Sequence, residues 1–125
     1  MYTILIVDDE RPAQTFLKAI CQKYCPAFDT ILLSGSADDA LRLMAQQHVH
    51  VLVTDISMPG INGIELAQRV RQLYPRTHTV IVSGYAEFEF ARGAIQAGVD
   101  DYLLKPVEIQ SFRQILDRIR ETLDA

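Results

Sequence analysis

The hydrophobic residues of the chain follow two alternating patterns. Short continuous runs rich in Ile, Val and Leu occupy residues 3–7, 30–33, 51–54, 79–82 and 101–104. Runs of this length and composition predict strands of a parallel sheet that is covered on both faces, and the last run is the weakest of the five. After each run, hydrophobic residues recur every three or four positions, which predicts five amphipathic helices.

Each predicted helix has one apolar face. These faces comprise Ala13, Phe16, Leu17, Ile20 and Tyr24; Ala37, Ala40, Leu41 and Met44; Ile64, Ala67, Val70 and Leu73; Phe88, Ala91, Ile95 and Gly98; and Ile109, Phe112, Leu116, Ile119 and Leu123. Signals at the helix ends agree, since Pro12 suits a first helical turn and Gly98 can close the fourth helix. Ser36 followed by Asp39 is typical of a capping arrangement. We therefore expect the apolar faces to pack against the sheet.

Alternating strands and helices predict an α/β fold, with a five-stranded parallel sheet and five helices distributed over both of its faces. The crossovers between parallel strands should be right-handed. For the strand order we adopt 2-1-3-4-5, the arrangement of flavodoxin-like doubly wound sheets, as a known pattern and not as a derivation from these residues. In such a sheet, ligands bind outside the carboxyl ends of the strands where the order reverses, here between strands one and three.

The bulk composition indicates one domain over residues 1–125. With 49% hydrophobic residues, a chain of this length can bury one sizeable core. Its formal net charge of -4 is opposite in sign to a surface that binds a phosphate backbone, so we expect no direct nucleic-acid binding. No apolar run is long enough to span a bilayer and no signal peptide precedes the first strand, which favours a cytoplasmic domain without membrane contact.

Cysteine and histidine suggest no separate site. Cys21 and Cys25 are four residues apart in a helical pattern, and no second pair completes a zinc site. We expect packed, reduced thiols instead of a disulfide or a metal pair. His48, His50 and His78 fall near predicted element boundaries without ligand spacing, so we interpret them as surface or loop residues and assign them no function.

Chemically related side chains follow four of the five predicted strands. They are Asp8 and Asp9 after the first strand, Asp55 after the third, Ser83 after the fourth and Lys105 after the fifth. Taken singly, each is more simply explained as a helix cap, a strand terminus or a solvated lysine. Their joint position at one edge of the sheet favours a functional site, because independent caps and turns have no reason to select these residue types together.

Electrostatics narrows the chemistry of this predicted site. Two unit charges about 4 Å apart interact by about 4 kcal/mol at an effective dielectric near 20, so three clustered carboxylates require a compensating cation. An all-oxygen cluster suits a hard ion, and Mg2+ accepts one or two carboxylates while it binds phosphate oxygens. This combination indicates phosphoryl transfer, in which a carboxylate can be the nucleophile while an ammonium and a hydroxyl stabilise the transferring oxygens.

Other phosphate chemistry finds less support in the sequence. There is no G-x-x-x-x-G-K-[ST] loop and no G-x-G-x-x-G after the first strand, which argues against nucleotide and dinucleotide sites. A haloacid dehalogenase-type hydrolase needs a second Asp two residues after its nucleophile, and Ser57 stands there instead. A metal-dependent phosphatase that turns over through an Asp55 intermediate is kept as the enzymatic alternative.

Four segments together resemble the receiver domain of two-component response regulators. They are residues 4–10 (ILIVDDE), 54–66 (TDISMPGINGIEL), 83–85 (SGY) and 101–106 (DYLLKP), and the resemblance extends from residue 4 to residue 123. It implies a phosphorylation-dependent signalling switch rather than an enzyme, in which a sensor histidine kinase supplies the phosphoryl group. A receiver fold that signals only through protein contacts and is never phosphorylated is the binding-class alternative.

The resemblance also implies roles for individual residues. Asp55 accepts the phosphoryl group, and Lys105 and Ser83 contact its oxygens. Tyr102 matches the switch aromatic whose rotamer is coupled to the hydroxyl residue, and the alternative for it is a packed strand tyrosine. The family's cis peptide maps onto the bond before Pro106, where X-Pro chemistry lowers the cost of cis.

For the metal, the resemblance implies that Mg2+ is bound by Asp9 directly, by Asp8 through water, by Asp55, and by the backbone carbonyl of Ser57. Gly84 departs from the small Ala that commonly follows the hydroxyl residue, which bears on phosphoryl accessibility and lifetime.

Residues 83–91 and 98–107 are similar to receivers of regulators with an AraC-type DNA-binding output. No output domain is present in residues 1–125, so we interpret the chain as an isolated receiver, with a stand-alone receiver as the alternative. In the switch that the resemblance implies, phosphorylation changes the face of helix four, strand five and helix five to control transcription. The resemblance is also compatible with a homodimer that forms on phosphorylation.

Overall fold

The computed structural model describes residues 1–89, 92–93 and 98–125 with their side chains. The five strands are β1 (Thr3–Val7), β2 (Thr30–Ser34), β3 (Val51–Asp55), β4 (His78–Ser83) and β5 (Asp101–Leu104). All neighbouring strands are parallel, and their order is β2-β1-β3-β4-β5. The predicted fold and the adopted strand order are therefore confirmed.

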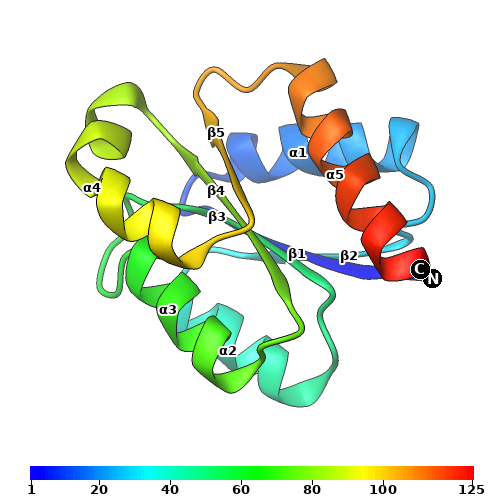
Figure 1. Ribbon diagram of the computed structural model, residues 1–125, viewed down its shortest axis with the longest axis horizontal. Helices are drawn as coiled ribbons and strands as arrows, with labels where there is room; N and C mark the ends of the chain where they lie inside the picture. Colours follow the sequence, from blue (N-terminus) through cyan, green and yellow to red (C-terminus); the bar gives the residue numbers. More distant parts are fainter.

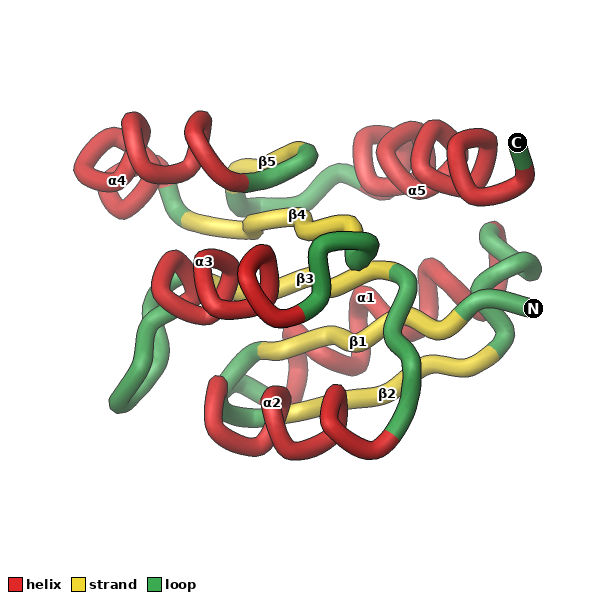
Figure 2. The backbone as a smooth tube through the Cα atoms, turned by 60° about the horizontal axis from the view of Figure 1, so that its bottom comes forward, coloured by secondary structure: helices red, strands yellow, loops and turns green.

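Five helices join the strands and cover both faces of the sheet. They are α1 (Arg11–Tyr24), α2 (Ala37–Gln46), α3 (Gly63–Leu73), α4 (Tyr85–Gly98) and α5 (Ile109–Asp124). Helices α1 and α5 lie on one face, and α2, α3 and α4 lie on the other (Figures 1 and 2). The sheet is thus the middle layer of three, and its carboxyl edge is left for loops.

Alternation along the strands divides the core into two layers. In β1, Ile4 and Ile6 pack with α1 and α5, whereas Leu5 and Val7 pack with α2 and α3. Strand β3 is buried at every position. Burial on both faces explains why these strands are continuous hydrophobic runs instead of alternating ones.

Three residues that the helical patterns place in the core are instead exposed. Phe16 is 43% exposed, Leu73 61% and Ile109 40%. Leu73 and Ile109 are terminal residues of their helices. Phe16 lies at the border of the α1 face, which is centred near Leu17 and includes the fully buried Cys21.

Other predicted features of the helices can be compared directly. Pro12 lies in the first turn of α1, the Oγ of Ser36 accepts a hydrogen bond from the backbone N–H of Asp39 (3.1 Å), and α4 ends at Gly98. These three predictions are confirmed. The predicted contacts of Ala91 and Ile95 lie outside the described residues.

Both cysteines are buried free thiols, as predicted. Burial, with a contribution from Cys25, raises the pKa of Cys21 to about 12. Nδ1 of the partly buried His50 accepts a hydrogen bond from the backbone N–H of Thr3 (2.9 Å), a structural role. Among the helices as described, none is long and apolar enough to cross a membrane.

Candidate functional site

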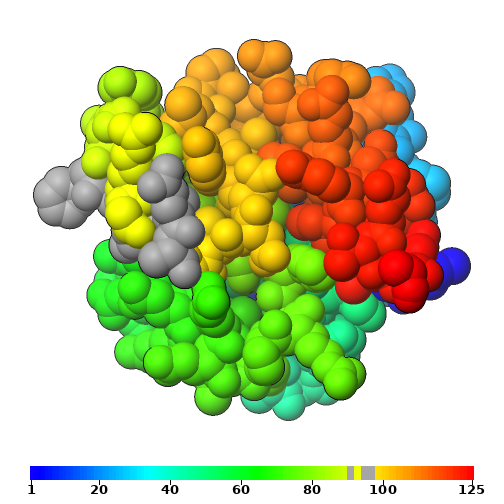
Figure 3. All heavy atoms as spheres, viewed as in Figure 1, coloured from blue at the N-terminus to red at the C-terminus, as the bar shows by residue number. Residues whose placement is uncertain are grey.

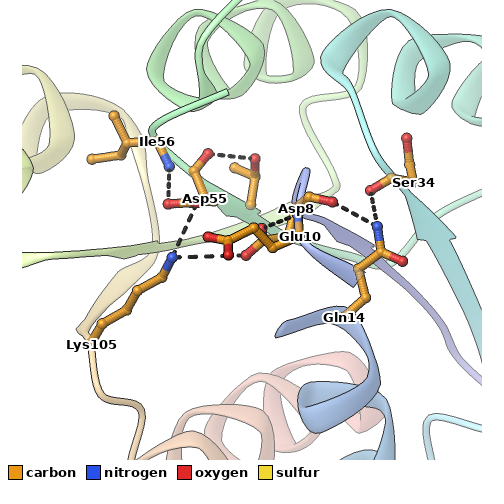
Figure 4. A network of polar contacts seen from close by, with 8 residues as sticks. Asp8, Glu10, Gln14, Ser34, Asp55, Ile56 and Lys105 are labelled. Atoms are coloured by element: carbon orange, nitrogen blue, oxygen red, sulfur yellow. Dashed lines mark hydrogen bonds and ion pairs between the residues drawn. The ribbon is translucent and has the colours of Figure 1, made fainter. Parts of the chain in front are cut away.

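The predicted site residues lie at the carboxyl edge of the sheet. Asp55 and Ser83 are the last residues of β3 and β4, and Asp8 and Lys105 directly follow β1 and β5. Because β1, β3, β4 and β5 are neighbours in this order, their parallel ends bring these side chains to one edge. Figure 4 shows Asp8, Asp55 and Lys105 facing one another.

The Asp55 carboxylate is held in one orientation. Its side chain is buried, with 5% of the residue exposed. Oδ1 accepts a hydrogen bond from the backbone N–H of Ile56 (2.8 Å), and Oδ2 accepts one from Nζ of Lys105 (3.1 Å) (Figure 4). Charge-assisted bonds of this kind are stronger than neutral ones, so they hold the carboxylate in this orientation.

The loop after β3 is shaped so that α3 packs closely behind Asp55. A Cβ on Gly63 would lie 1.9 Å from the backbone oxygen of Asp55, so only glycine fits. The N–H of Gly63 donates to the carbonyl of Ile56 (3.0 Å), and Gly60 has a positive φ of 76°. Asn62 caps α3 through its Oδ1. These contacts fix the conformation of the loop that follows Asp55.

Lys105 lies between two carboxylates. Its Nζ is 3.1 Å from Oδ2 of Asp55 and 3.9 Å from Oδ2 of Asp8. Burial lowers the pKa of this amine, but the hydrogen bond to Asp55 and the charges of Asp55, Asp8 and Glu10 outweigh that effect, so the net shift is upward. Lys105 is therefore an ammonium at neutral pH.

The backbone around Lys105 is also fixed. Its N–H donates to the carbonyl of Ser83 (2.8 Å), and its bond to Pro106 is cis. The cis bond expected before Pro106 is confirmed.

Asp8 is the most buried acid of the cluster, with 3% of the residue exposed. Burial is the main cause that raises the pKa of Asp8. The charges of Asp55 and Asp9 add to it, while the backbone N–H of Glu10 and the charge of Lys105 oppose it. That N–H donates to Oδ1 of Asp8 (2.9 Å). The ionised form of Asp8 is therefore disfavoured in the folded protein, and a nearby cation would stabilise it.

The carboxylates of Asp8, Asp9 and Glu10 form a group that could hold a metal ion. Their oxygens lie within 4.8 Å of one another, and Asp9 and Glu10 are exposed. The predicted metal set included Asp8 and Asp9 but missed Glu10, although it is the third acid of the same run after β1. Asp55 is not in this group, but it shares Lys105 with Asp8.

This donor set fits a hard divalent cation. All side-chain donors are oxygens, which Mg2+ prefers, and Asp8 of the acidic group shares the Lys105 ammonium with Asp55. Ser57 is exposed and lies in the loop after β3. Only its backbone carbonyl was predicted to take part.

Ser83 supplies a polar atom without a partner. In the part of the chain that the structure describes, its Oγ is the one buried side-chain polar atom that makes no hydrogen bond. Such an atom costs about 1–3 kcal/mol unless a ligand or water satisfies it. A hydroxyl in this state at the end of β4 suits an oxygen-rich ligand.

Tyr102 lies in β5 and contacts α4. It is 39% exposed, and its ring packs on Phe88 of α4 with ring centroids 4.5 Å apart and planes 30° apart. The side chain thus links β5 to α4 and is neither fully buried nor fully solvated.

Comparison with known proteins gives a consistent result. The family model for the response regulator receiver domain matches residues 4–117. Transcriptional regulatory protein HptR of Staphylococcus aureus is 37% identical over 123 residues, which cover 98% of this chain and 48% of that protein. The uncharacterized transcriptional regulatory protein YesN of Bacillus subtilis is 33% identical over 119 residues, which cover 95% of this chain and 32% of that protein. The chain thus spans half or less of these relatives.

Solved structures agree with the family match. The chain superimposes with a TM-score of 0.86 on a two component transcriptional regulator AraC from Clostridium phytofermentans, at 30% identity and with coverage of 98% of this chain and 95% of that one. The REC domain of AraT, a response regulator from Geobacillus stearothermophilus, gives a TM-score of 0.87 at 31% identity, with the same coverage. The fold, the acids at the sheet edge and the matched residues lead to one conclusion: the chain belongs to the response regulator receiver domain family.

Proposed function

We propose that this domain is a phosphorylation-dependent switch that accepts a phosphoryl group onto Asp55 from a sensor histidine kinase. One observation carries the proposal: the buried Asp55 carboxylate is held by Ile56 and Lys105, at the same edge as the acidic cluster. We also propose that the domain acts in the cytoplasm.

In the proposed reaction, an Asp55 carboxylate oxygen attacks the phosphorus of the kinase phosphohistidine. The new O–P bond forms while the P–N bond breaks, and the kinase histidine leaves as the neutral imidazole after it takes up a proton. The Lys105 ammonium neutralises charge on the phosphoryl oxygens. The Ser83 hydroxyl donates a hydrogen bond to one of them, which gives this unpartnered atom a partner.

Asp8, Asp9, Asp55 and the carbonyl of Ser57 would hold a divalent cation, for which the oxygen donors are suited. Bound Mg2+ would supply positive charge that offsets charge on the transferring oxygens.

The proposed output is the face formed by α4, β5 and α5, which faces the viewer in Figure 3. Tyr102, Leu104 and Ile109 expose apolar surface there, each between 38% and 40%. When Ser83 turns to the phosphoryl group, Tyr102 reorients against Phe88 and changes this face. The similarity to the AraC and AraT receivers supports an AraC-type DNA-binding output domain outside residues 1–125, with a dimer of receivers as one mode of control.

The test is to treat the chain with a small phosphodonor and Mg2+ and locate the label by mass spectrometry. We expect phosphate on Asp55 in the wild type and none in Asp55→Asn. Undiminished labelling of Asp55→Asn would refute the assignment. Multiple-turnover hydrolysis of phosphate monoesters would instead support a phosphatase.

A further inference from the structure

Glu10 is an acidic residue of the carboxyl edge that the proposed reaction leaves without a role. It is the N-cap residue of α1, with an extended backbone, and its side chain makes no capping hydrogen bond. Across the described residues, its exposed carboxylate takes part in no hydrogen bond or ion pair, and only its backbone N–H donates to Asp8. A carboxylate without such a structural bond is available to act on a ligand.

The backbone turn after β1 brings the Glu10 carboxylate next to those of Asp8 and Asp9. The N–H of Glu10 donates to Oδ1 of Asp8 (2.9 Å) and closes a tight turn. The turn gathers the carboxylates of Asp8, Asp9 and Glu10 within 4.8 Å, and Figure 4 shows Glu10 lying against Asp8. Glu10 is therefore electrostatically part of the same site.

The carboxyl edge carries excess negative charge, to which Glu10 contributes and which attracts a divalent cation. Four carboxylates and one ammonium leave a formal sum of about -3, and a divalent cation would reduce it to about -1. A carboxylate about 6 Å from a doubly charged ion in a water-like dielectric changes its affinity by about tenfold at low salt. The charge of Glu10 is thus large enough to matter even without direct contact.

We infer that Glu10 is a positioning residue for the divalent cation, which it attracts by its charge through the water shell of the ion and not as a direct ligand. The inference rests on the proposed function, which puts a cation at this site. Mg2+ takes one or two carboxylates and keeps several waters, so a further exposed acid acts on that shell. Attraction through water is strongly screened by salt.

The test is isothermal titration calorimetry of the full chain with magnesium chloride. We expect Glu10→Gln to weaken Mg2+ binding about five- to tenfold at low ionic strength, and the difference from wild type to fall below about twofold in about 1 M potassium chloride. Glu10→Asp keeps the charge and should stay within about threefold of wild type.

Glu108→Gln is the matched control. Glu108 is the N-cap residue of α5, has an extended backbone and makes no capping hydrogen bond, like Glu10, but it is not in the group of Asp8, Asp9 and Glu10. It should leave Mg2+ affinity within about twofold, because the same net charge is lost outside that group.

Three results would overturn the inference, and each has a different meaning. Equal affinity of Glu10→Gln and Glu108→Gln would show that Glu10 has no specific effect. A loss in Glu10→Gln that persists in 1 M salt would make Glu10 a direct ligand. A wild-type chain that is folded by circular dichroism but binds no Mg2+ would refute the proposed cation site itself.

Discussion

The two edges of the sheet use acidic residues in opposite ways. At the amino edge three acids have partners of their own: the Met1 ammonium pairs with Asp29, the Tyr2 hydroxyl donates to Asp124, and His78 lies 3.3 Å from Asp100. At the carboxyl edge the carboxylates of Asp8, Asp9 and Glu10 lie close together, and Asp8 and Asp55 share the Lys105 ammonium.

This difference separates acids with a structural role from acids that we propose to act on a ligand. Acids with individual partners fasten the chain ends and loops at the amino edge and leave little charge for a ligand. Acids that share one ammonium repel one another, and they keep their place because the fold around them is stable. We therefore expect substitutions at the two edges to have opposite signs, and the following variants test that contrast in order of expected effect.

The largest effect should come from Gly63→Ala. The added Cβ would collide with the backbone oxygen of Asp55 at 1.9 Å, and a backbone atom cannot rotate away. We expect a loss of at least about 3 kcal/mol in the free energy of unfolding, measured by urea denaturation. The control is Gly93→Ala, where a Cβ would meet nothing within 4 Å. That variant should be neutral or more stable by up to about 1 kcal/mol.

Lys105→Met tests whether phosphorylation at the carboxyl edge depends on the Lys105 ammonium. Loss of the ammonium removes the hydrogen bond to Asp55 and the charge near Asp8, so phosphorylation by a small donor should slow by about 100-fold. The rate would be followed by mass spectrometry. Lys23→Met makes the same charge change on α1, next to Tyr24, and should leave the rate within about twofold. Similar rates in both variants would show that Lys105 is only a surface lysine.

Asp8→Asn and Asp100→Asn compare the edges directly. The pKa of Asp8 is raised, chiefly by burial, so its ionised form destabilises the folded protein. At neutral pH, Asp8→Asn should raise the free energy of unfolding by about 1 kcal/mol without Mg2+. The pKa of Asp8 is higher in the folded protein than in the unfolded chain. The stability gained by Asp8→Asn is therefore complete above the folded-state pKa and disappears as the pH falls through that value.

Asp100→Asn should have the opposite sign. Oδ2 of Asp100 accepts a hydrogen bond from the N–H of Thr79 (2.7 Å), and its other oxygen faces His78. We expect a loss of about 1 kcal/mol at neutral pH, since a charged acceptor is removed. Denaturation curves that move in the same direction for both aspartates would contradict the contrast.

The smallest effect should come from Tyr2→Phe at the amino edge. The lost hydrogen bond to Asp124 is exposed to solvent, so the midpoint of thermal unfolding should change by no more than about 2 °C. Mg2+ binding and phosphorylation should be unchanged. An altered Mg2+ affinity in this variant would mean that the edges are coupled.

The strands and most of the carboxyl edge could be predicted from the sequence because both depend on local rules. Continuous Ile, Val and Leu runs identify buried parallel strands, and the residue after each run falls at the same edge. The exposure of Phe16, Leu73 and Ile109 could not be predicted, since Phe16 lies at the border of an apolar face and the other two are the terminal residues of their helices. Periodicity gives the direction of a helix face but not its limits.

The roles of two residues needed coordinates. Glu10 joins the acidic cluster through a turn that its own N–H closes on Asp8, and sequence spacing alone does not distinguish this from a solvated helix start. Ser83 was predicted from its position after a strand, but its unpartnered hydroxyl follows from the packing of β4 and β5 around it.

The hydrogen bond between Tyr2 and Asp124 has a consequence for engineering. It joins the residue before β1 to the end of α5, so both chain ends lie at the amino edge of the sheet (Figure 1). A short peptide between Met1 and Ala125 would turn the backbone into a ring with little distortion, and new ends could then be opened elsewhere. The domain is thus suited to circular permutation, in which its acids would be supplied in a different order along the chain.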